Sequence, residues 1–189
     1  MRQAASSSPG SDRDILNEYA PSNAASFRAK GGADRTRVAK YRDSIMAAAR
    51  EHNIPAPIIA GVMSRESRAG NALDANHCGD GGRAFGLMQI DKITSGVQPR
   101  GEWNSSEHIS QATGMLAANL RAVSKAHPQW SEAEKLRGAV AAYNFGVKNV
   151  LTVDNMDFKT THNNYSADVW ARAIELAPIF DQKPIKSQL

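Results

Sequence analysis

Residues 58–67 read Ile-Ile-Ala-Gly-Val-Met-Ser-Arg-Glu-Ser, a Gly-rich segment follows, and residues 84–91 read Ala-Phe-Gly-Leu-Met-Gln-Ile-Asp. The first piece is predicted to be a helix. Pro55 and Pro57 stand at its start, where a missing N–H costs little, and Gly70 can end it. The Gly-rich part has no helical period, and short strands of a small antiparallel hairpin or sheet are expected there.

Glu66 lies on the apolar face of the predicted helix. The residues three, four and seven positions before it are Met63, Val62 and Ile59, which share its face on a 3.6-residue period. The neighbouring Arg65 is expected to point elsewhere. A carboxylic acid on an apolar face is either buried and paired, or it keeps its proton near neutral pH because desolvation raises its pKa. The second state is what a general acid requires.

Two further carboxylates, Asp80 and Asp91, follow closely in the chain without an apolar stripe around them, so both are expected to stay ionised. One protonated and one ionised carboxylate across a cleft is the arrangement that hydrolyses glycosidic bonds. On the residues alone, a structural reading stays open for each of these acids. Glu66 could be paired with an Arg, and Asp80 could simply be a turn residue.

Three motifs in chain order resemble the lysozyme-like peptidoglycan-cleaving enzymes. They are Ser64-Arg65-Glu66-Ser67, Gly86-Leu87-Met88-Gln89 and Ala142-Tyr143-Asn144. Longer matches are similar to the goose-type (g-type) lysozymes over roughly residues 15–180. These are Ala60-Gly61, Ser64 to Gly70, Phe85 to Lys92, His108-Ile109, and Thr161 to Tyr165 with Asp168-Val169. The resemblance implies an α+β, mostly helical lysozyme-like fold, in which helices surround a central buried helix and a small antiparallel sheet lines the cleft.

The resemblance also implies roles for individual residues. Glu66 would be the general acid, and Asp80 and Asp91 would hold and activate water in an inverting hydrolysis. The substrate would be the β-1,4 bond between N-acetylmuramic acid and N-acetylglucosamine, in bacterial peptidoglycan or in N-acetylglucosamine oligomers. Four residues would contact or support the substrate: Tyr143, Asn144, Tyr165 and Gln89. Tyr143 and Asn144 would lie beside Glu66, and Gln89 would support the site floor or reach the sugar. No cofactor or metal is implied, and none of the five histidines has a partner at metal-ligand spacing.

Two other functions are compatible with these motifs. A lytic transglycosylase shares the Glu, Gly-Leu-Met-Gln and Ala-Tyr-Asn motifs but uses the hydroxyl of its own substrate, without a water-holding Asp pair. The presence of both Asp80 and Asp91 favours hydrolysis. A wall-binding protein that has lost catalysis is the alternative from another class, and an intact Glu66 disfavours it.

Length and composition limit the number of domains, the disulfides and the classes of partner that the protein can have. The chain has 189 residues, enough for one domain, expected over 15–189 after a flexible segment 1–14. Cys78, expected to lie in a loop, is the only cysteine, so no intramolecular disulfide is expected, unlike in bird members of the family. The net charge of +4 favours polyanionic partners, but the scattered Lys and Arg do not indicate nucleic-acid binding.

No apolar run is long enough for a membrane span, and a monomer is expected. The N-terminus shows no signal peptide. Family analogy implies secretion, because the family role is antibacterial defence, whereas the lack of a signal peptide leaves a cytoplasmic location or non-classical release open.

Several elements are expected elsewhere along the chain. Residues 15–33 are interpreted as coil, and Asp34 as the cap of a helix that continues to Glu51. A helix over 105–126 is expected to be the central core element, with a capping box at Asn104 and Glu107. Two further helices are expected: one after a capping box at Ser131 and Glu134, continuing to Tyr143, and one over 164–177. The polar tail after Asp181 is expected to be frayed.

Overall fold

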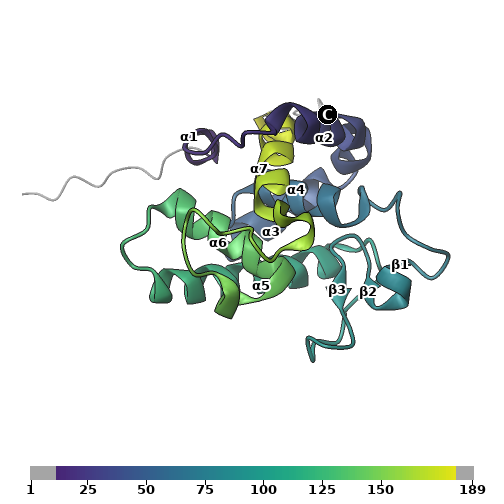
Figure 1. The fold of residues 1–189 in the computed structure, drawn as a ribbon. Helices are drawn as coiled ribbons and strands as arrows, with labels where there is room; N and C mark the ends of the chain where they lie inside the picture. The colour runs from purple at the N-terminus through teal and green to yellow at the C-terminus, as the bar shows by residue number, and fades with distance from the viewer. Residues whose placement is uncertain (1–11, 182–189) are drawn as a thin grey trace, which may run out of the picture.

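The computed structural model describes residues 12–181 and is mostly helical, with one small antiparallel sheet (Figure 1). This confirms the predicted α+β class. The helices are α1 (Asp12–Asn17), α2 (Ala24–Ala39), α3 (Arg42–His52), α4 (Ala56–Ser67), α5 (Ser106–Ala126), α6 (Glu132–Phe145), α7 (Tyr165–Leu176) and α8 (Pro178–Asp181). The strands are β1 (Cys78–Gly79), β2 (Ala84–Phe85) and β3 (Ile90–Asp91), and the 3₁₀ turns are η1 (Asp80–Gly82), η2 (Val147–Asn149) and η3 (Thr161–Asn163).

Helix α4 is the central buried helix. Ten of its twelve residues are buried, and α7, α2 and α3 pack around it (Figure 1). The prediction that residues 105–126 form the central helix was wrong. Helix α5 packs against α3 and α6 on one face and exposes residues such as Arg121 on the other. Length and a clear apolar stripe are typical of a helix at the edge of a core, whereas α4 is apolar on nearly every side.

Helices α4 and α7 approach so closely at Gly61 that a side chain has no room. A Cβ at Gly61 would lie 2.6 Å from the carbonyl oxygen of Val169 and 3.2 Å from the backbone nitrogen of Ala173. We expect Gly61→Ala to destabilise the fold by roughly 1–3 kcal/mol, because backbone atoms must move apart. Gly32→Ala is the matched control, since its Cβ would lie 3.7 Å from Glu175 Oε1.

Thermal unfolding of both variants measures this effect. The control should gain up to about 1 kcal/mol, because alanine favours a helix over glycine. A Gly61→Ala protein that unfolds at or above the wild-type temperature would contradict the tight packing of α4 on α7.

The N-terminal part is more helical than the sequence indicated. The expected coil over 15–33 instead contains the end of α1 and most of α2, and α1 begins within the predicted flexible segment 1–14. The small residues of α2 allow this helix to pack closely against α7. A Cβ at Gly31 would lie 3.1 Å from the Cα of Arg172 on α7. Residues 1–11 and the predicted frayed tail after Asp181 lie outside the described residues.

Asp34 does not cap a helix as predicted but lies buried within α2. The helix predicted to continue from Asp34 to Glu51 is interrupted at residues 40–41, between α2 and α3. Its carboxylate accepts a hydrogen bond from the Ser64 hydroxyl at 2.7 Å, so it serves a tertiary contact. Helix α5 is capped by Ser105 instead of Asn104, because the Ser105 hydroxyl accepts from the backbone N–H of His108. The predicted capping box of Ser131 and Glu134 is confirmed.

The predicted small antiparallel sheet is confirmed, with order β1-β2-β3. Cys78 pairs with Phe85, and Ala84 pairs with Asp91. Cys78 was predicted to lie in a loop, but it is a buried strand residue whose sulfur accepts a hydrogen bond from the Lys92 amine at 3.3 Å.

His108 joins α5 to the turn between β2 and β3. Its ring is fully buried, and its Nε2 accepts a hydrogen bond of 3.1 Å from the backbone N–H of Met88. Burial lowers the pKa of His108 to about 4. Since an unfolded histidine titrates near 6.5, the unfolded state binds more protons between those values. Stability is therefore fully present above about pH 6.5 and is lost, on the order of 3 kcal/mol, as the pH falls towards 4.

Thermal unfolding between pH 7.5 and pH 4 tests this prediction with His108→Gln, whose amide oxygen can still accept from Met88 but does not titrate. The variant should unfold at a lower temperature than the wild type at neutral pH, because it loses ring packing. Its unfolding temperature should then fall less on acidification. Equal acid sensitivity of both proteins would sink the assignment to His108.

Candidate active site

Glu66 stands in the last turn of α4, half-buried, and faces the start of α7. The buried hydroxyl of Tyr165, the first residue of α7, donates a hydrogen bond to its carboxyl group. Tyr143 approaches from α6, and its hydroxyl donates to the carbonyl of Met88 at 2.8 Å. Thus α4, α6, α7 and the β2–β3 turn meet at one carboxylic acid.

The surroundings of Glu66 favour its protonated form. Burial raises the pKa of Glu66 to about 7, although the Tyr165 hydrogen bond and the charge of Arg65 act in the opposite direction. Burial, with the nearby Glu66 carboxylate, also raises the pKa of Tyr143 and of Tyr165 well above 10. Both hydroxyls therefore stay protonated and act as donors, while Glu66 carries a proton that it can release near neutral pH.

The loop before α7 fixes Tyr165. The Thr160 hydroxyl accepts from the Tyr165 N–H at 3.1 Å. Asp157, buried in that loop, accepts hydrogen bonds from the N–H and the hydroxyl of Ser166, both at 2.7 Å. It therefore caps the N-terminus of α7, although it lies nine residues before Ser166 in the sequence. Sequence reasoning missed Asp157, because a cap nine residues away leaves no local pattern.

Asn144, predicted to lie beside Glu66, ties α6 to η3. Its side-chain oxygen accepts from the backbone N–H of Thr161 at 2.9 Å, and its amide nitrogen donates to the Thr161 hydroxyl at 3.1 Å. These bonds hold the segment that precedes Tyr165. A direct contact of Asn144 with substrate stays a prediction.

Gln89, predicted to support the site floor or reach the sugar, folds back onto its own hairpin. Its amide nitrogen donates to the carbonyl of Gly86 at 2.8 Å, and its amide oxygen occupies the space where a Cβ of Gly79 would lie. These contacts support a structural role for Gln89 at the site floor. Its direct contact with a sugar stays a prediction.

The sheet places Asp80 and Asp91 at the same end of its strands, one after β1 and the other on β3, which lie on opposite sides of β2. Gly79 pairs with Ala84, which pairs with Asp91, so the three backbones form a row roughly 10 Å wide. Asp80 follows Gly79 in a left-handed conformation, with its side chain 80% exposed and 4.0 Å from Arg83.

Asp91 is engaged within its own turn. The Thr94 hydroxyl donates to one carboxylate oxygen, and the N–H groups of Ile93 and Thr94 donate to the other at 2.7 and 2.8 Å. These bonds, led by that of the Thr94 hydroxyl, lower the pKa of Asp91 to about 2. Asp91 is thus ionised at every working pH, in agreement with the expected state.

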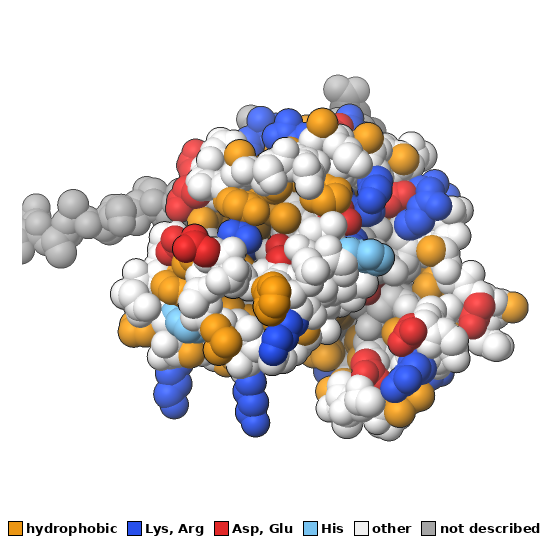
Figure 2. Space-filling model, viewed as in Figure 1, with side chains coloured by type: hydrophobic (Ala, Val, Ile, Leu, Met, Phe, Trp, Pro, Cys, Tyr) orange, Lys and Arg blue, Asp and Glu red, His pale blue; other side chains and the backbone are white. Residues whose placement is uncertain are grey.

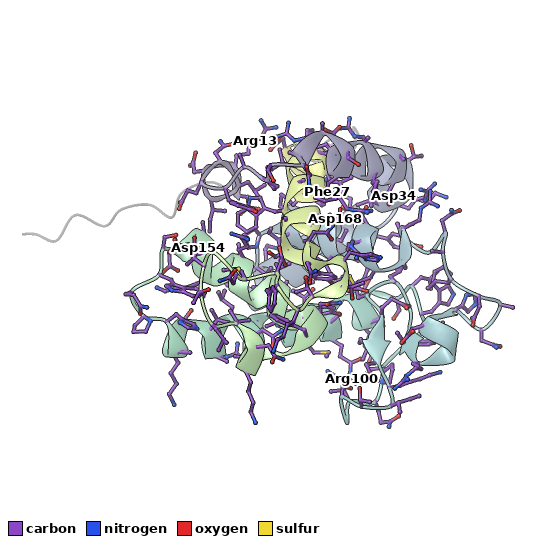
Figure 3. The ribbon with its side chains drawn as sticks, in the orientation of Figure 1. Arg13, Phe27, Asp34, Arg100, Asp154 and Asp168 are labelled. Atoms are coloured by element: carbon purple, nitrogen blue, oxygen red, sulfur yellow. The ribbon has the colours of Figure 1, made fainter. Side chains whose placement is uncertain are left out.

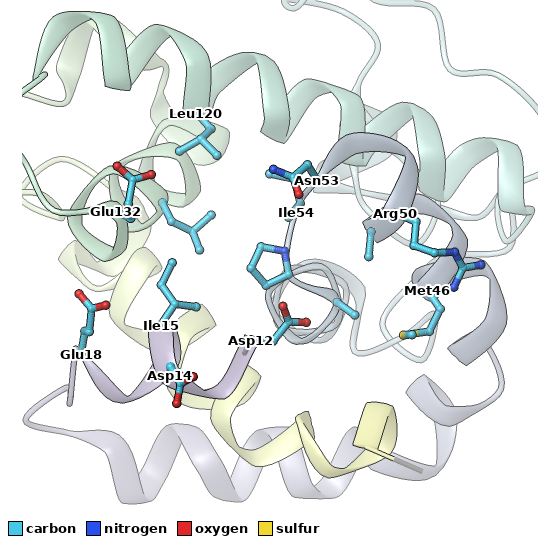
Figure 4. Close-up of a pocket in the computed structure, with 14 residues that line it drawn as sticks. Asp12, Asp14, Ile15, Glu18, Met46, Arg50, Asn53, Ile54, Leu120 and Glu132 are labelled. Atoms are coloured by element: carbon cyan, nitrogen blue, oxygen red, sulfur yellow. The ribbon is translucent and has the colours of Figure 1, made fainter. Parts of the chain in front are cut away.

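The surface is hollowed where the lobe that carries the sheet meets the helical body, and acidic side chains lie on that lobe (Figure 2). A separate cavity of about 630 Å³ lies between α1, α3, α5 and α6 (Figure 4). Acidic residues such as Asp12, Glu18 and Glu132 line it together with Arg50, but none of the predicted site residues does. The candidate site is therefore the group around Glu66.

Within residues 12–181, no three His, Cys, Asp or Glu side chains are grouped as metal ligands would be. Over the same residues, no helix has the length and apolar character needed to cross a membrane. A reaction without metal stays a prediction.

Comparison with known proteins places these features in a family. The family model described as Lysozyme g matches residues 6–174. A Lysozyme g of Takifugu rubripes is 46% identical over 144 residues, which cover 74% of this chain and 75% of that protein. Lysozyme G of Dromaius novaehollandiae is 42% identical over 134 residues, covering 71% of this chain and 64% of that protein.

A relative that is not named as a lysozyme is also similar in sequence. The glycine, glutamate and proline-rich protein of Lottia gigantea is 41% identical over 148 residues, which cover 76% of this chain but 35% of that longer protein. Because the family model spans most of the sequence and the relatives cover about three quarters of it, the chain belongs to the lysozyme g family of glycoside hydrolases.

Proposed function

We propose that this enzyme hydrolyses the β-1,4 bond between N-acetylmuramic acid and N-acetylglucosamine of bacterial peptidoglycan, with inversion at the anomeric carbon. The observation that carries the proposal is Glu66, a half-buried acid with a pKa of about 7 and an oriented hydrogen-bond partner in Tyr165. Such an acid is protonated at the pH of action and can release its proton as the bond breaks.

In the proposed step, the proton of Glu66 passes to the glycosidic oxygen while the bond from that oxygen to the anomeric carbon breaks. A water molecule attacks the carbon from the opposite face and gives a proton to the carboxylate of Asp80 or Asp91. Asp91 has about four acceptor positions and uses three within its turn, so one remains to orient that water. Asp80, exposed at the same end of the sheet, completes the pair.

Bacterial wall as substrate fits the charge of the protein. A net charge of +4 favours approach to polyanionic walls. We further propose that the enzyme acts outside the cell that makes it, as a monomer, in antibacterial defence, because its substrate lies on the surface of another cell.

Proton NMR of sugars freshly released from purified peptidoglycan tests the mechanism. The α-anomer should dominate the new reducing ends within the first minutes, before mutarotation, because water attacks opposite the leaving β-bond. Early β-anomer would contradict inversion. A 1,6-anhydro product would identify a transglycosylase, and absence of any released sugar would leave a wall-binding protein.

A further inference from the structure

Arg65 lies between the proposed acid and a network of charges built on two buried carboxylates. Its guanidinium carbon is 5.3 Å from the centre of the Tyr165 ring, and the hydroxyl of that same ring donates to Glu66. On its other side, Arg65 Nε is 3.0 Å from Asp168 Oδ2. This contact is ionic and not a well-aligned hydrogen bond, because Nε has no hydrogen-bond partner. The expectation that Arg65 points away from the site was therefore wrong.

The network continues across three helices. Asp168 accepts from Arg172 Nε at 2.6 Å, and Arg172 Nη1 donates to the hydroxyl of Ser64 at 3.0 Å and lies 3.6 Å from Asp34. The carboxylates of Asp168 and Asp34 are 5% and 1% exposed. Figure 3 shows Asp168 on α7 and Asp34 on α2, beside α4.

The network carries an excess of positive charge. Two carboxylates, those of Asp34 and Asp168, contact four guanidinium groups, those of Arg37, Arg65, Arg68 and Arg172, which leaves a net charge of +2. Buried ion pairs often add little stability over apolar packing, so stability does not by itself account for the network. Arg65 is the member that contacts the ring of Tyr165.

We propose that Arg65, held by Asp168, is a positioning residue that keeps the Tyr165 hydroxyl on Glu66 and directs positive charge at that carboxyl group. The inference rests on the proposed function, because it assumes that Glu66 is the acid. The charged and titratable groups that act on Glu66 are Arg65 from α4, Tyr143 from α6 and Tyr165 from α7. The hairpin segment 86–90 carries no charged side chain.

Replacing Arg65 with Met tests the proposal, because the variant removes the charge but keeps an unbranched side chain. Asp168 would still be paired with Arg172, so the fold should survive. Titration of the Glu66 carboxyl carbon by ¹³C NMR should show its midpoint rising by about one pH unit, since the carboxylate loses a stabilising charge. The alkaline limb of the pH–activity profile on peptidoglycan should move by the same amount.

Arg68→Met is the matched control. Arg68 belongs to the same network, 3.9 Å from Asp34, but its side chain is 56% exposed and solvent screens it. Its removal should leave the midpoint and the limb in place. Arg65→Lys keeps the charge and should hold the midpoint within a few tenths of a pH unit of the wild type.

An Arg65→Met protein that unfolds at a lower temperature but keeps the wild-type midpoint and limb would overturn the proposal, since the network would then serve stability alone. Glu66→Gln, assayed in parallel, separates this failure from a failure of the proposed function. If Glu66→Gln retains activity, Glu66 is not the acid, whatever the NMR midpoint does in Arg65→Met. If Glu66→Gln is inactive and the midpoint does not move, only the role of Arg65 fails.

Discussion

Glu66→Gln should lower the rate of peptidoglycan hydrolysis by about 10²- to 10⁴-fold, the usual contribution of a general acid. Glutamine has the shape of glutamate, and its amide oxygen can still accept from Tyr165, so the site should keep its geometry. It has no proton to give to the leaving oxygen. The decrease in turbidity of a peptidoglycan suspension measures the rate, and co-sedimentation with purified walls should show unchanged binding.

The same substitution should make the protein more stable at alkaline pH. The pKa of Glu66 is raised from 4.5 in the unfolded chain to about 7 in the fold. Below about pH 4.5 Glu66 is protonated in both the folded and the unfolded state and costs no stability. As the pH rises towards 7, the unfolded state loses this proton first, so the free energy of unfolding falls. Because the side chain is half-buried, we expect a gain on the order of 2 kcal/mol for Glu66→Gln at pH 8 and almost none at pH 4.

Glu132→Gln is the control for both measurements, because its side chain is 77% exposed and lies on α6 away from Tyr165. It should change neither the rate nor the stability at pH 8 appreciably. Wild-type lysis by Glu66→Gln would remove the general acid from the mechanism. A loss of stability at pH 8 would show that the acid is not desolvated in the fold.

Local patterns were sufficient to predict the acid and its helix. The 3.6-residue period placed Glu66 on a face with Met63, Val62 and Ile59, all of which are fully buried. The capping box at Ser131 and the small sheet in the Gly-rich region could likewise be predicted, since each depends on residues close in sequence.

The surroundings of the acid could not be derived from local patterns. The Tyr165 hydroxyl that bonds Glu66 comes from a residue 99 positions away, and only the resemblance to a family pointed to Tyr165. Asp34 has the sequence context of a helix cap, yet burial against Ser64 on α4 placed it inside α2. Arg65 was expected to point away from the site because helical period describes one helix, whereas its partners lie on α7.

Asp80→Asn and Asp91→Asn should each lower the hydrolysis rate by about 10²-fold, because each removes a charge that holds or activates the attacking water. The two losses should not multiply. If both carboxylates act on one water molecule, the double variant should lose little more than the worse single variant, as groups that act as a unit do. The measurement is a double-mutant cycle: initial rates on purified peptidoglycan are compared for the wild type, the two single variants and the double variant.

The turn at Asp91 makes the experiment interpretable, because an asparagine oxygen can still accept from the N–H groups of Ile93 and Thr94. Unfolding temperatures near wild type would confirm that charge and not the turn was removed. Asp43→Asn, at a side chain 97% exposed on α3, controls for the general loss of a surface charge. Wild-type rates from both single variants would remove the two aspartates from water activation. A loss of about 10⁴-fold in the double variant would mean that the two carboxylates act independently and not as a unit on one water molecule, since independent contributions to a barrier multiply in the rate.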